Sequence, residues 1–291
     1  MTTQAFYMSQ SFITDPKEFS YLYQALPHDI PGLCHAVQGL VLHYVGERHL
    51  VGGTIPYARL CEIDTRYAPR ILARLLEMDS RTLTEARTPA NRFVGCCRDF
   101  SVLFCSMLRY LGVPARTRSG FADYFVKGYY IDHVVVEYWN GTSWQLVDSE
   151  LPPDPNWGFD VTNVPRDRFV VGGMAWQMCR REKADPELFG LWPEVPVRGW
   201  GFIRGRLMHD LAALNKHEML CWDQWNYADP DLALSSEDEA LLDRVASATQ
   251  GGNDAFDEVR ALFADPRLAV PTPMKSWSPA QERLMDVTLA R

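Results

Sequence analysis

A cysteine stands where the sequence predicts the start of a buried helix. Residues 91–116 read NRFVGCCRDFSVLFCSMLRYLGVPAR, a loop followed by an apolar helical stretch that Gly112 and Pro114 end. The N–H groups and the dipole at a helix N-terminus favour a thiolate over a thiol. Cys96 or Cys97 is therefore a candidate nucleophile, and this chemistry requires a base within reach.

A predicted β-hairpin supplies candidates for the base and its partner. Asn140-Gly141, which is typical of a tight turn, stands between two stretches rich in β-branched and aromatic residues, 129–138 and 144–147. A two-residue loop sets His133 directly opposite Asp148, and a four-residue loop makes them diagonal neighbours on one face. Only a three-residue loop sends them to opposite faces. An aspartate beside an imidazole fixes its tautomer and stabilises its charged form, which a cysteine nucleophile needs.

Four short segments, in the order Cys, His, Asp, carry a family pattern. They are GCCRDFS at 95–101, LRYLGVPAR at 108–116, HVVVE at 133–137 and WQLVD at 144–148. In the same order they resemble the G-x-C-x-D-F-A, L-R-x-x-G-I-P-A-R, H-A-W-x-E and G-W-x-x-x-D motifs of the transglutaminase-like superfamily. This superfamily consists of papain-fold cysteine enzymes, and the resemblance covers about 60 residues.

The resemblance implies a role for each of three residues by motif position. Cys97 would be the nucleophile, His133 the general acid/base, and Asp148 the residue that orients the histidine. The motif register also selects Cys97 over the cysteine before it. The chain departs from the pattern where Val134-Val135 replaces Ala-Trp and Ser149-Glu150 replaces Pro-Thr. Neither departure removes a catalytic group, and both are expected to reshape the pocket.

The implied fold class is α+β. It comprises a transglutaminase-like or papain-like core with N-terminal helices, a catalytic helix packed on an antiparallel sheet, and a helical C-terminal elaboration. We expect the core over residues 1–165 and the mainly helical elaboration over 166–291, packed on the core and not necessarily an independent domain. Ser236 and Glu239 are expected to form a capping box. Apolar spacing and helix-start signals predict the individual helices at 16–26, 31–47, 71–78, 205–225, 237–248 and 255–263.

Composition argues against several classes of function. The formal net charge of −8 disfavours a nucleic-acid or anionic-membrane surface, and no apolar run reaches the roughly 18 residues of a membrane-spanning helix. The seven cysteines form no C-x-x-C pair and no zinc-spaced cluster, so we expect neither a disulfide framework nor a metal. The start of the chain shows no secretory signal. We therefore expect a cytoplasmic enzyme that needs no cofactor.

The predicted reaction is acyl transfer through a thioester. The Cys97 thiolate would attack an amide or other acyl carbonyl with the help of His133, and the backbone N–H of Cys97 is one candidate oxyanion donor. Hydrolysis of a peptide-like amide, as by an amidase or cysteine protease, is the leading expectation. An acyltransferase that passes the group to an amine, as a transglutaminase does, is the close alternative. A third hypothesis is a catalytically inactive module that binds peptides.

Other residue types of interest receive a structural interpretation or a weaker hypothesis. Arg116 and Arg118 could bind a substrate carboxylate, but structural ion pairs are the more common role. Residues 192–225 carry four tryptophans, which are usually core; we hypothesise that part of this segment covers the active-site cleft and sets acyl-chain specificity. No metal site is assigned to the residues of the second half that resemble ligands, His209, His217 and Cys221.

Overall fold

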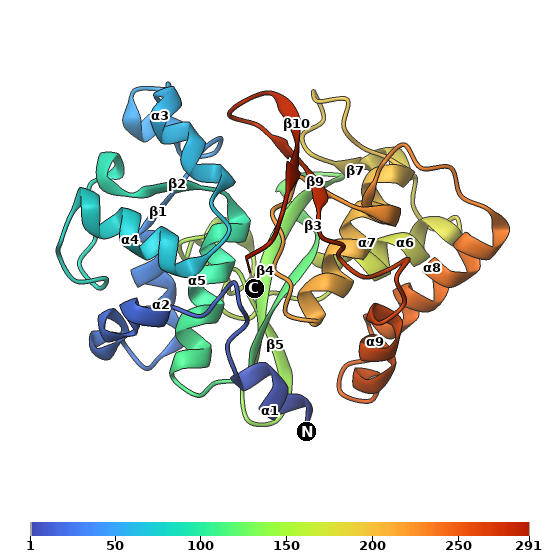
Figure 1. Cartoon of the computed structure of the whole chain (residues 1–291), viewed down its shortest axis with the longest axis horizontal. Helices are drawn as coiled ribbons and strands as arrows, with labels where there is room; N and C mark the ends of the chain where they lie inside the picture. The colour runs from blue at the N-terminus through green and yellow to red at the C-terminus, as the bar shows by residue number, and fades with distance from the viewer. Residues whose placement is uncertain (1, 291) are drawn as a thin grey trace. The chain divides into compact units, whose positions relative to one another are not determined.

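The computed structural model describes residues 2–290, which divide into two compact units (Figure 1). Unit 1 comprises the chain up to residue 116 together with 135–164 and 278–283, and unit 2 comprises 117–134, 165–277 and 284 onward. Two of the boundaries fall inside strands β3 (Ala115–Val126) and β4 (Tyr129–Trp139), so both units share these strands. The predicted domain boundary at residue 165 stays a prediction.

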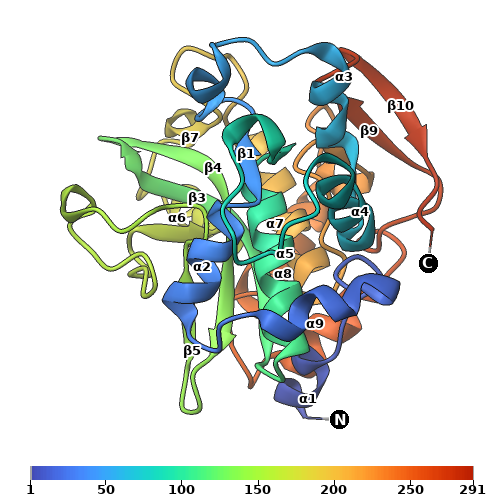
Figure 2. The same ribbon diagram turned by 90° about the vertical axis from the view of Figure 1, so that its left-hand side faces the viewer.

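Unit 1 contains a long buried helix, α5 (Cys97–Tyr110). Every residue of α5 except Tyr110 is buried, and Gly112, with φ +77°, follows its end as predicted. The helix packs against α1 (Thr3–Met8), α2 (Ile30–Gln38) and α4 (Ala68–Met78), as Figure 2 shows for α2 and α4. The shorter elements are helix α3 (Tyr57–Leu60) and the 3₁₀ helices Lys17–Ala25, Arg48–Val51, Cys61–Asp64 and Pro89–Asn91.

Two short parallel strands of unit 1 correct a prediction. The sequence predicted one helix over 31–47, but α2 ends at Gln38, and β1 (Val41–His43) follows it. Strand β1 pairs with β2 (Phe93–Gly95), which sets His43 opposite Gly95. A short apolar run fits a buried strand as well as a helix, and only a distant pairing partner decides between them.

The largest sheet confirms the predicted hairpin and the α+β class. Its strand order is β5-β4-β3-β6, and β5 (Trp144–Val147) pairs with β4 so that Trp139 lies opposite Trp144. This register belongs to the four-residue loop, which Asn140 stabilises by accepting the N–H groups of Thr142 and Ser143. Strand β3 was not predicted, nor were β6 (Phe169–Val171), which pairs with β3, and β7 (Phe189–Gly190), which runs parallel to β4.

Unit 2 is mainly helical. The central helix α7 (Trp200–Leu214) packs against α6 (Gly172–Arg180), α8 (Ser236–Ala248) and α9 (Phe256–Phe263), and Figure 1 shows α6, α7 and α8 side by side. The three predicted helices correspond to α7, α8 and α9, whereas α6 was not predicted. Among residues 2–290, no helix combines the length and the apolarity needed to cross a bilayer.

Two details of unit 2 differ from the sequence prediction. Helix α7 ends at Leu214, well before residue 225, and Lys216 just beyond it has a φ of +61°, which a continuing helix does not allow. The capping box of α8 uses Ser235 and Asp238, each one residue earlier than predicted.

An unpredicted sheet has the order β10-β9-β8, made of Arg283–Val287, Met274–Ser278 and Asp223–Gln224.

Candidate active site

Cys97 is the first residue of α5, and the local sequence explains this position. Cys96 is the N-cap, and Oδ2 of Asp99 accepts its backbone N–H at 2.9 Å, which completes a capping box. Gly95 makes room for this carboxylate, because a Cβ at residue 95 would lie 2.7 Å from Oδ2 of Asp99. The spacing of glycine, cysteine and aspartate in the motif is therefore the spacing of a capped helix start.

A buried ion pair holds the first turn of α5. Nη1 of Arg98 lies 2.9 Å from Oδ1 of Asp99, and Nη2 of Arg98 donates to the carbonyl oxygen of Arg66 at 2.7 Å. Buried charges need such additional hydrogen bonds, because their attraction alone rarely repays the loss of hydration. The pair fixes the carboxylate that caps the helix and, through it, the backbone that carries Cys97.

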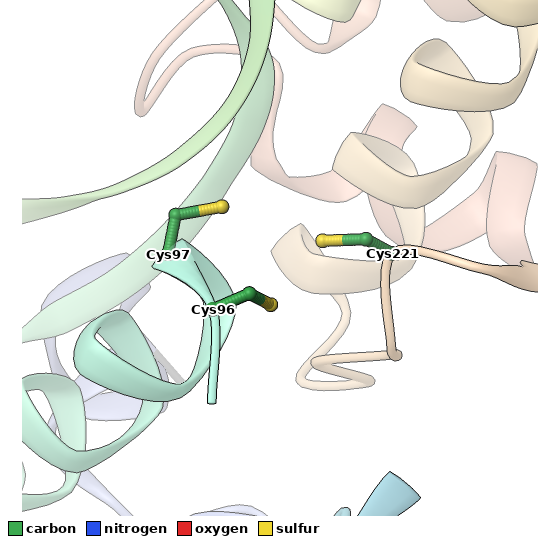
Figure 3. A group of neighbouring side chains, drawn as sticks. All are labelled: Cys96, Cys97 and Cys221. Atoms are coloured by element: carbon green, nitrogen blue, oxygen red, sulfur yellow. The ribbon is translucent and has the colours of Figure 1, made fainter. Parts of the chain in front are cut away.

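The two adjacent thiols differ in surroundings. Their side chains leave the start of α5 in different directions (Figure 3), although the two Sγ atoms lie within 4.8 Å of one another. The sulfur of Cys96 turns back toward the backbone N–H of Asp99 as part of the capping box. Cys97 is outside that box, and it is 7% exposed against 4% for Cys96.

Asp148 lies directly after β5 and is fully buried. Its backbone N–H donates to the carbonyl oxygen of Val161 at 2.8 Å, and its Oδ1 accepts the N–H of Glu150 at 3.1 Å. Burial raises the pKa of the Cys34 thiol to about 12, and the negative charge of Asp148 adds to this shift. The two hydrogen bonds thus fix the position of the buried Asp148 within unit 1.

A second carboxylate, that of Glu150, lies beside the thiol. One of its carboxylate oxygens is within 4.8 Å of Sγ of Cys97, and its Oε1 is 4.0 Å from Nε2 of His43. Within unit 1, the carboxylate of Glu150 thereby has both Cys97 and His43 as neighbours. Sequence reasoning missed both residues, since His43 fell in a predicted helix and Glu150 was noted only as a departure from the family pattern. That departure was the one available signal.

His133 lies on β4, in the part of the strand that belongs to unit 2, and is buried. Three aromatic rings surround it edge-on within this unit, with the centroid of Phe125 at 5.1 Å, that of Tyr124 at 6.2 Å and that of Phe169 at 6.4 Å. The structure therefore places the three predicted catalytic residues at the start of α5, after β5 and on β4.

The residue before His133 carries a perturbed carboxyl group. Burial raises the pKa of Asp132 to about 7, even though the guanidinium of Arg206, 3.3 Å away, acts to lower it. Nη2 of the same Arg206 also donates to the carbonyl oxygen of Cys221 at 2.5 Å. Asp132, on the strand that carries His133, and Arg206, on α7, therefore form a buried pair.

The other candidate residues from the sequence have structural roles wherever the structure gives their contacts. Arg116 pairs with Glu137 at 2.7 Å and Arg118 pairs with Asp210 at 2.8 Å, and all four side chains are buried, as predicted. In the Trp-rich segment, Trp225 is buried against His209, whereas Trp192 and Trp200 are partly exposed. The proposed cover of the active-site cleft stays a prediction.

Comparison with known proteins agrees with the motifs. Residues 74–149 match the family model of the transglutaminase-like superfamily, which confirms the resemblance, and this range contains Cys97, His133 and Asp148. A search of curated proteins found no match. A solved structure of a candidate cysteine protease from Cytophaga hutchinsonii is similar at 15% identity and a TM-score of 0.35, over 58% of this chain and 45% of that one.

This chain thus spans less than half the length of that solved protein. The family match supports a cysteine enzyme in general, and it does not separate hydrolysis from acyl transfer.

Proposed function

Starting from the similarity of residues 74–149 to the transglutaminase-like superfamily, we propose that the protein is a cysteine enzyme that transfers an acyl group through a thioester. Cys97 is the proposed nucleophile. The observation that carries the proposal is the capped start of α5, where the helix dipole favours a thiolate at Cys97. Cys96 belongs to the cap itself, which favours Cys97 as the residue that reacts.

The hairpin register supports His133 and Asp148 as the other two members. Val136 lies opposite Val147, so the same register continued by one residue sets Val135 opposite Asp148. His133 precedes Val135 by two residues on one continuous strand, and residues two apart share a face. Diagonal neighbours on one face are within reach of aromatic and long side chains. In this proposal, Asp148 fixes the imidazole tautomer and His133 moves the proton.

The proposed reaction has two stages. The Cys97 thiolate attacks the acyl carbon, a C–S bond forms, and the carbonyl oxygen becomes an oxyanion to which the first N–H groups of α5 are oriented to donate. His133 then gives a proton to the departing amine, which leaves a thioester. In the second stage His133 takes a proton from water, the resulting hydroxide attacks the thioester, and the acid and the Cys97 thiolate are released.

Hydrolysis of a peptide-like amide is the leading form of this proposal. Transfer to a primary amine is the second form, and the carboxylate of Glu150 beside Cys97 favours it, because a carboxylate attracts the ammonium form of an acceptor. His133 then takes a proton from the ammonium, and the neutral amine attacks the thioester. Both forms share the first stage. They differ only in which nucleophile reaches the thioester and in how well water is excluded.

The test uses a glutamine-containing peptide with and without a primary amine. Ammonia release that is independent of the amine indicates hydrolysis, and incorporation of the amine, seen in the peptide mass, indicates transfer. We expect His133→Ala to lower the rate about 10²–10⁴-fold, as the loss of a general acid/base does. Turnover unaffected by His133→Ala would contradict the triad. Peptide binding without turnover and without a Cys97 adduct would indicate an inactive binding module instead.

A further inference from the structure

We propose that Glu150 makes the position beside Cys97 selective for a positively charged group on the molecule that reacts there, either an ammonium or a guanidinium. This inference rests on the proposed role of Cys97 as the nucleophile and adds a residue that determines specificity. It concerns unit 1 alone, since Cys97, Glu150 and His43 all belong to that unit. The carboxylate of Glu150 occurs where the family pattern has an uncharged residue.

The distance between the two side chains carries the proposal. A carboxylate oxygen of Glu150 lies within 4.8 Å of Sγ of Cys97. A reacting carbon approaches the attacking sulfur to about 3–3.5 Å before the bond forms. A group attached to that carbon therefore comes close enough to Glu150 for a charge-assisted hydrogen bond, which is shorter and stronger than a neutral one.

The backbone around Glu150 is held from both sides. Nε2 of Gln38, at the end of α2, donates to the carbonyl oxygens of Ser149 and Leu151 at 3.3 and 2.9 Å. The N–H of Glu150 itself donates to Oδ1 of Asp148. A carboxylate on such a fixed segment keeps its place while a substrate binds, so less conformational entropy is lost on binding.

The nearest atom of His43 lies 4.0 Å from the Glu150 carboxylate, and the ring of His43 is neutral. Nδ1 of His43 accepts the backbone N–H groups of Val45 and Gly46 at 3.2 and 3.0 Å. A ring nitrogen that accepts two hydrogen bonds carries no proton, so the proton of the neutral ring is on Nε2, which is the atom that faces Glu150. His43 in this form carries no positive charge that would pair with Glu150.

Partial burial strengthens the interaction of the Glu150 carboxylate with other charges and leaves part of its side chain accessible. The side chains of Glu150 and His43 are 17% and 18% exposed, so solvent reaches part of each, whereas Oε2 of Glu150 is buried; both groups are screened less than surface groups. A negative charge on Glu150 creates a negative potential beside Cys97. Such a potential raises the local concentration of cations and lowers that of anions.

The experiment measures how the charge of a small reagent affects its rate of reaction with Cys97. Methanethiosulfonates of similar size with a cationic, neutral or anionic side arm each transfer a thioalkyl group to a thiolate, forming a disulfide and releasing methanesulfinate. Intact mass and peptide mapping give the rate at Cys97, and Cys97→Ala gives the background from the other cysteines. We expect the cationic reagent to react faster than the anionic one, and Glu150→Gln to lower this ratio about tenfold.

Two variants control the result. Glu77→Gln removes the same charge from α4, where the side chain is 65% exposed and paired with Arg74, and should leave the ratio unchanged. Glu150→Asp keeps the charge and should keep most of the preference for the cation. The proposal is overturned if Glu150→Gln has the wild-type ratio, or if Glu77→Gln lowers it equally.

The neutral reagent tests the proposed function separately. If Cys97 reacts with it no faster than Cys61 and Cys221, both of which are partly exposed, then the nucleophile assignment fails whatever the charge ratio is. If Cys97 reacts fast with the neutral reagent and charge has no effect, only the role of Glu150 fails.

Discussion

Helices α5 and α7 are the central helices of units 1 and 2, and both bury charged side chains. They differ at the first turn. Helix α5 begins with a capping box at Cys96 that sets a thiol at position 97, whereas α7 begins after Gly199 with no side-chain cap and a partly exposed Trp200. The buried arginine, aspartate and histidine side chains are Arg98, Asp99 and Arg109 on α5 and Arg204, Arg206, His209 and Asp210 on α7.

The charges of α7 have structural partners. Asp210 accepts two hydrogen bonds from Arg118, at 2.9 and 2.8 Å, and one from the backbone N–H of Ser119 at 3.0 Å. His209 contacts the carbonyl oxygen of Asp223 at 2.9 Å, and burial lowers its pKa to about 3, so it stays neutral. The comparison teaches that buried charge does not by itself identify a functional site. What distinguishes α5 is a cysteine at a capped N-terminus, which we propose as the nucleophile.

The largest effect expected from this contrast is at Cys97. Cys97→Ala should lower kcat/KM at least about 10³-fold, because it removes the atom that forms the thioester. Cys96→Ala should leave most of the activity and cost about 1 kcal/mol of unfolding free energy through the lost cap. Steady-state kinetics and urea unfolding of both variants measure this. Similar activity losses in the two variants would mean that the motif register misidentified the nucleophile.

The next effect is on stability and falls on α7. Asp210→Ala should lower the unfolding free energy by about 3–5 kcal/mol, because it leaves Arg118 buried without its counter-charge. Urea unfolding measures this, and Cys97 alkylation in the folded variant should stay at the wild-type rate. Asp286→Ala, which removes an exposed partner of Lys275, is the control and should cost less than about 1 kcal/mol. A loss confined to activity would show that α7 serves the chemistry.

Substitutions of two glycines at opposite ends of α5 test whether the capping box affects the reactivity of Cys97. Gly95→Ala brings a Cβ to 2.7 Å from Oδ2 of Asp99, so it should cost about 1–2 kcal/mol and slow the alkylation of Cys97. Gly112→Ala strains a residue with φ +77° and should cost about 1–2 kcal/mol without changing the alkylation rate. Equal alkylation rates in the two variants would show that the capping box does not affect the reactivity of Cys97.

The last prediction concerns the pH dependence of stability at Asp132. Its pKa rises from 3.8 unfolded to about 7 folded, so the folded protein keeps a proton that the unfolded chain releases. This contribution to stability is complete below about pH 4 and is lost as the pH rises through 7. Asp132→Asn should therefore weaken the decrease in unfolding free energy between these values.

The check for Asp132 is urea unfolding of wild type and variant across that pH range. His209 contributes the opposite slope, with stability lost as the pH falls below its unfolded pKa, but it does so in both proteins. The difference between the two curves then isolates Asp132. Parallel curves would show that Asp132 has no raised pKa in the folded protein.

The parts of the fold that could be predicted are those whose signals are local. Helix α5 and the β4–β5 hairpin have their start, stop and turn residues within the segment itself, such as Gly112 and Asn140-Gly141. Strands β1, β3 and β9 were missed, because a short or unpatterned strand is defined by a partner elsewhere in the chain. The capping box of α8 was shifted by one residue, since neighbouring Ser235 and Ser236 both fit the pattern.

The sequence by itself determined a thiol at the start of a capped helix, a histidine and an aspartate on one hairpin, and the family they resemble. These features depend on hydrogen bonds and spacings between residues that are close in the sequence, so local sequence patterns predict them. Only the tertiary structure decided that Glu150 lies beside Cys97 and that His43 faces Glu150. Gln38 and the Ser149 carbonyl it binds are 111 residues apart, and no local pattern encodes a contact at that separation. The proposed nucleophile could therefore be predicted from the sequence, whereas the position of Glu150 beside it depended on how distant segments pack.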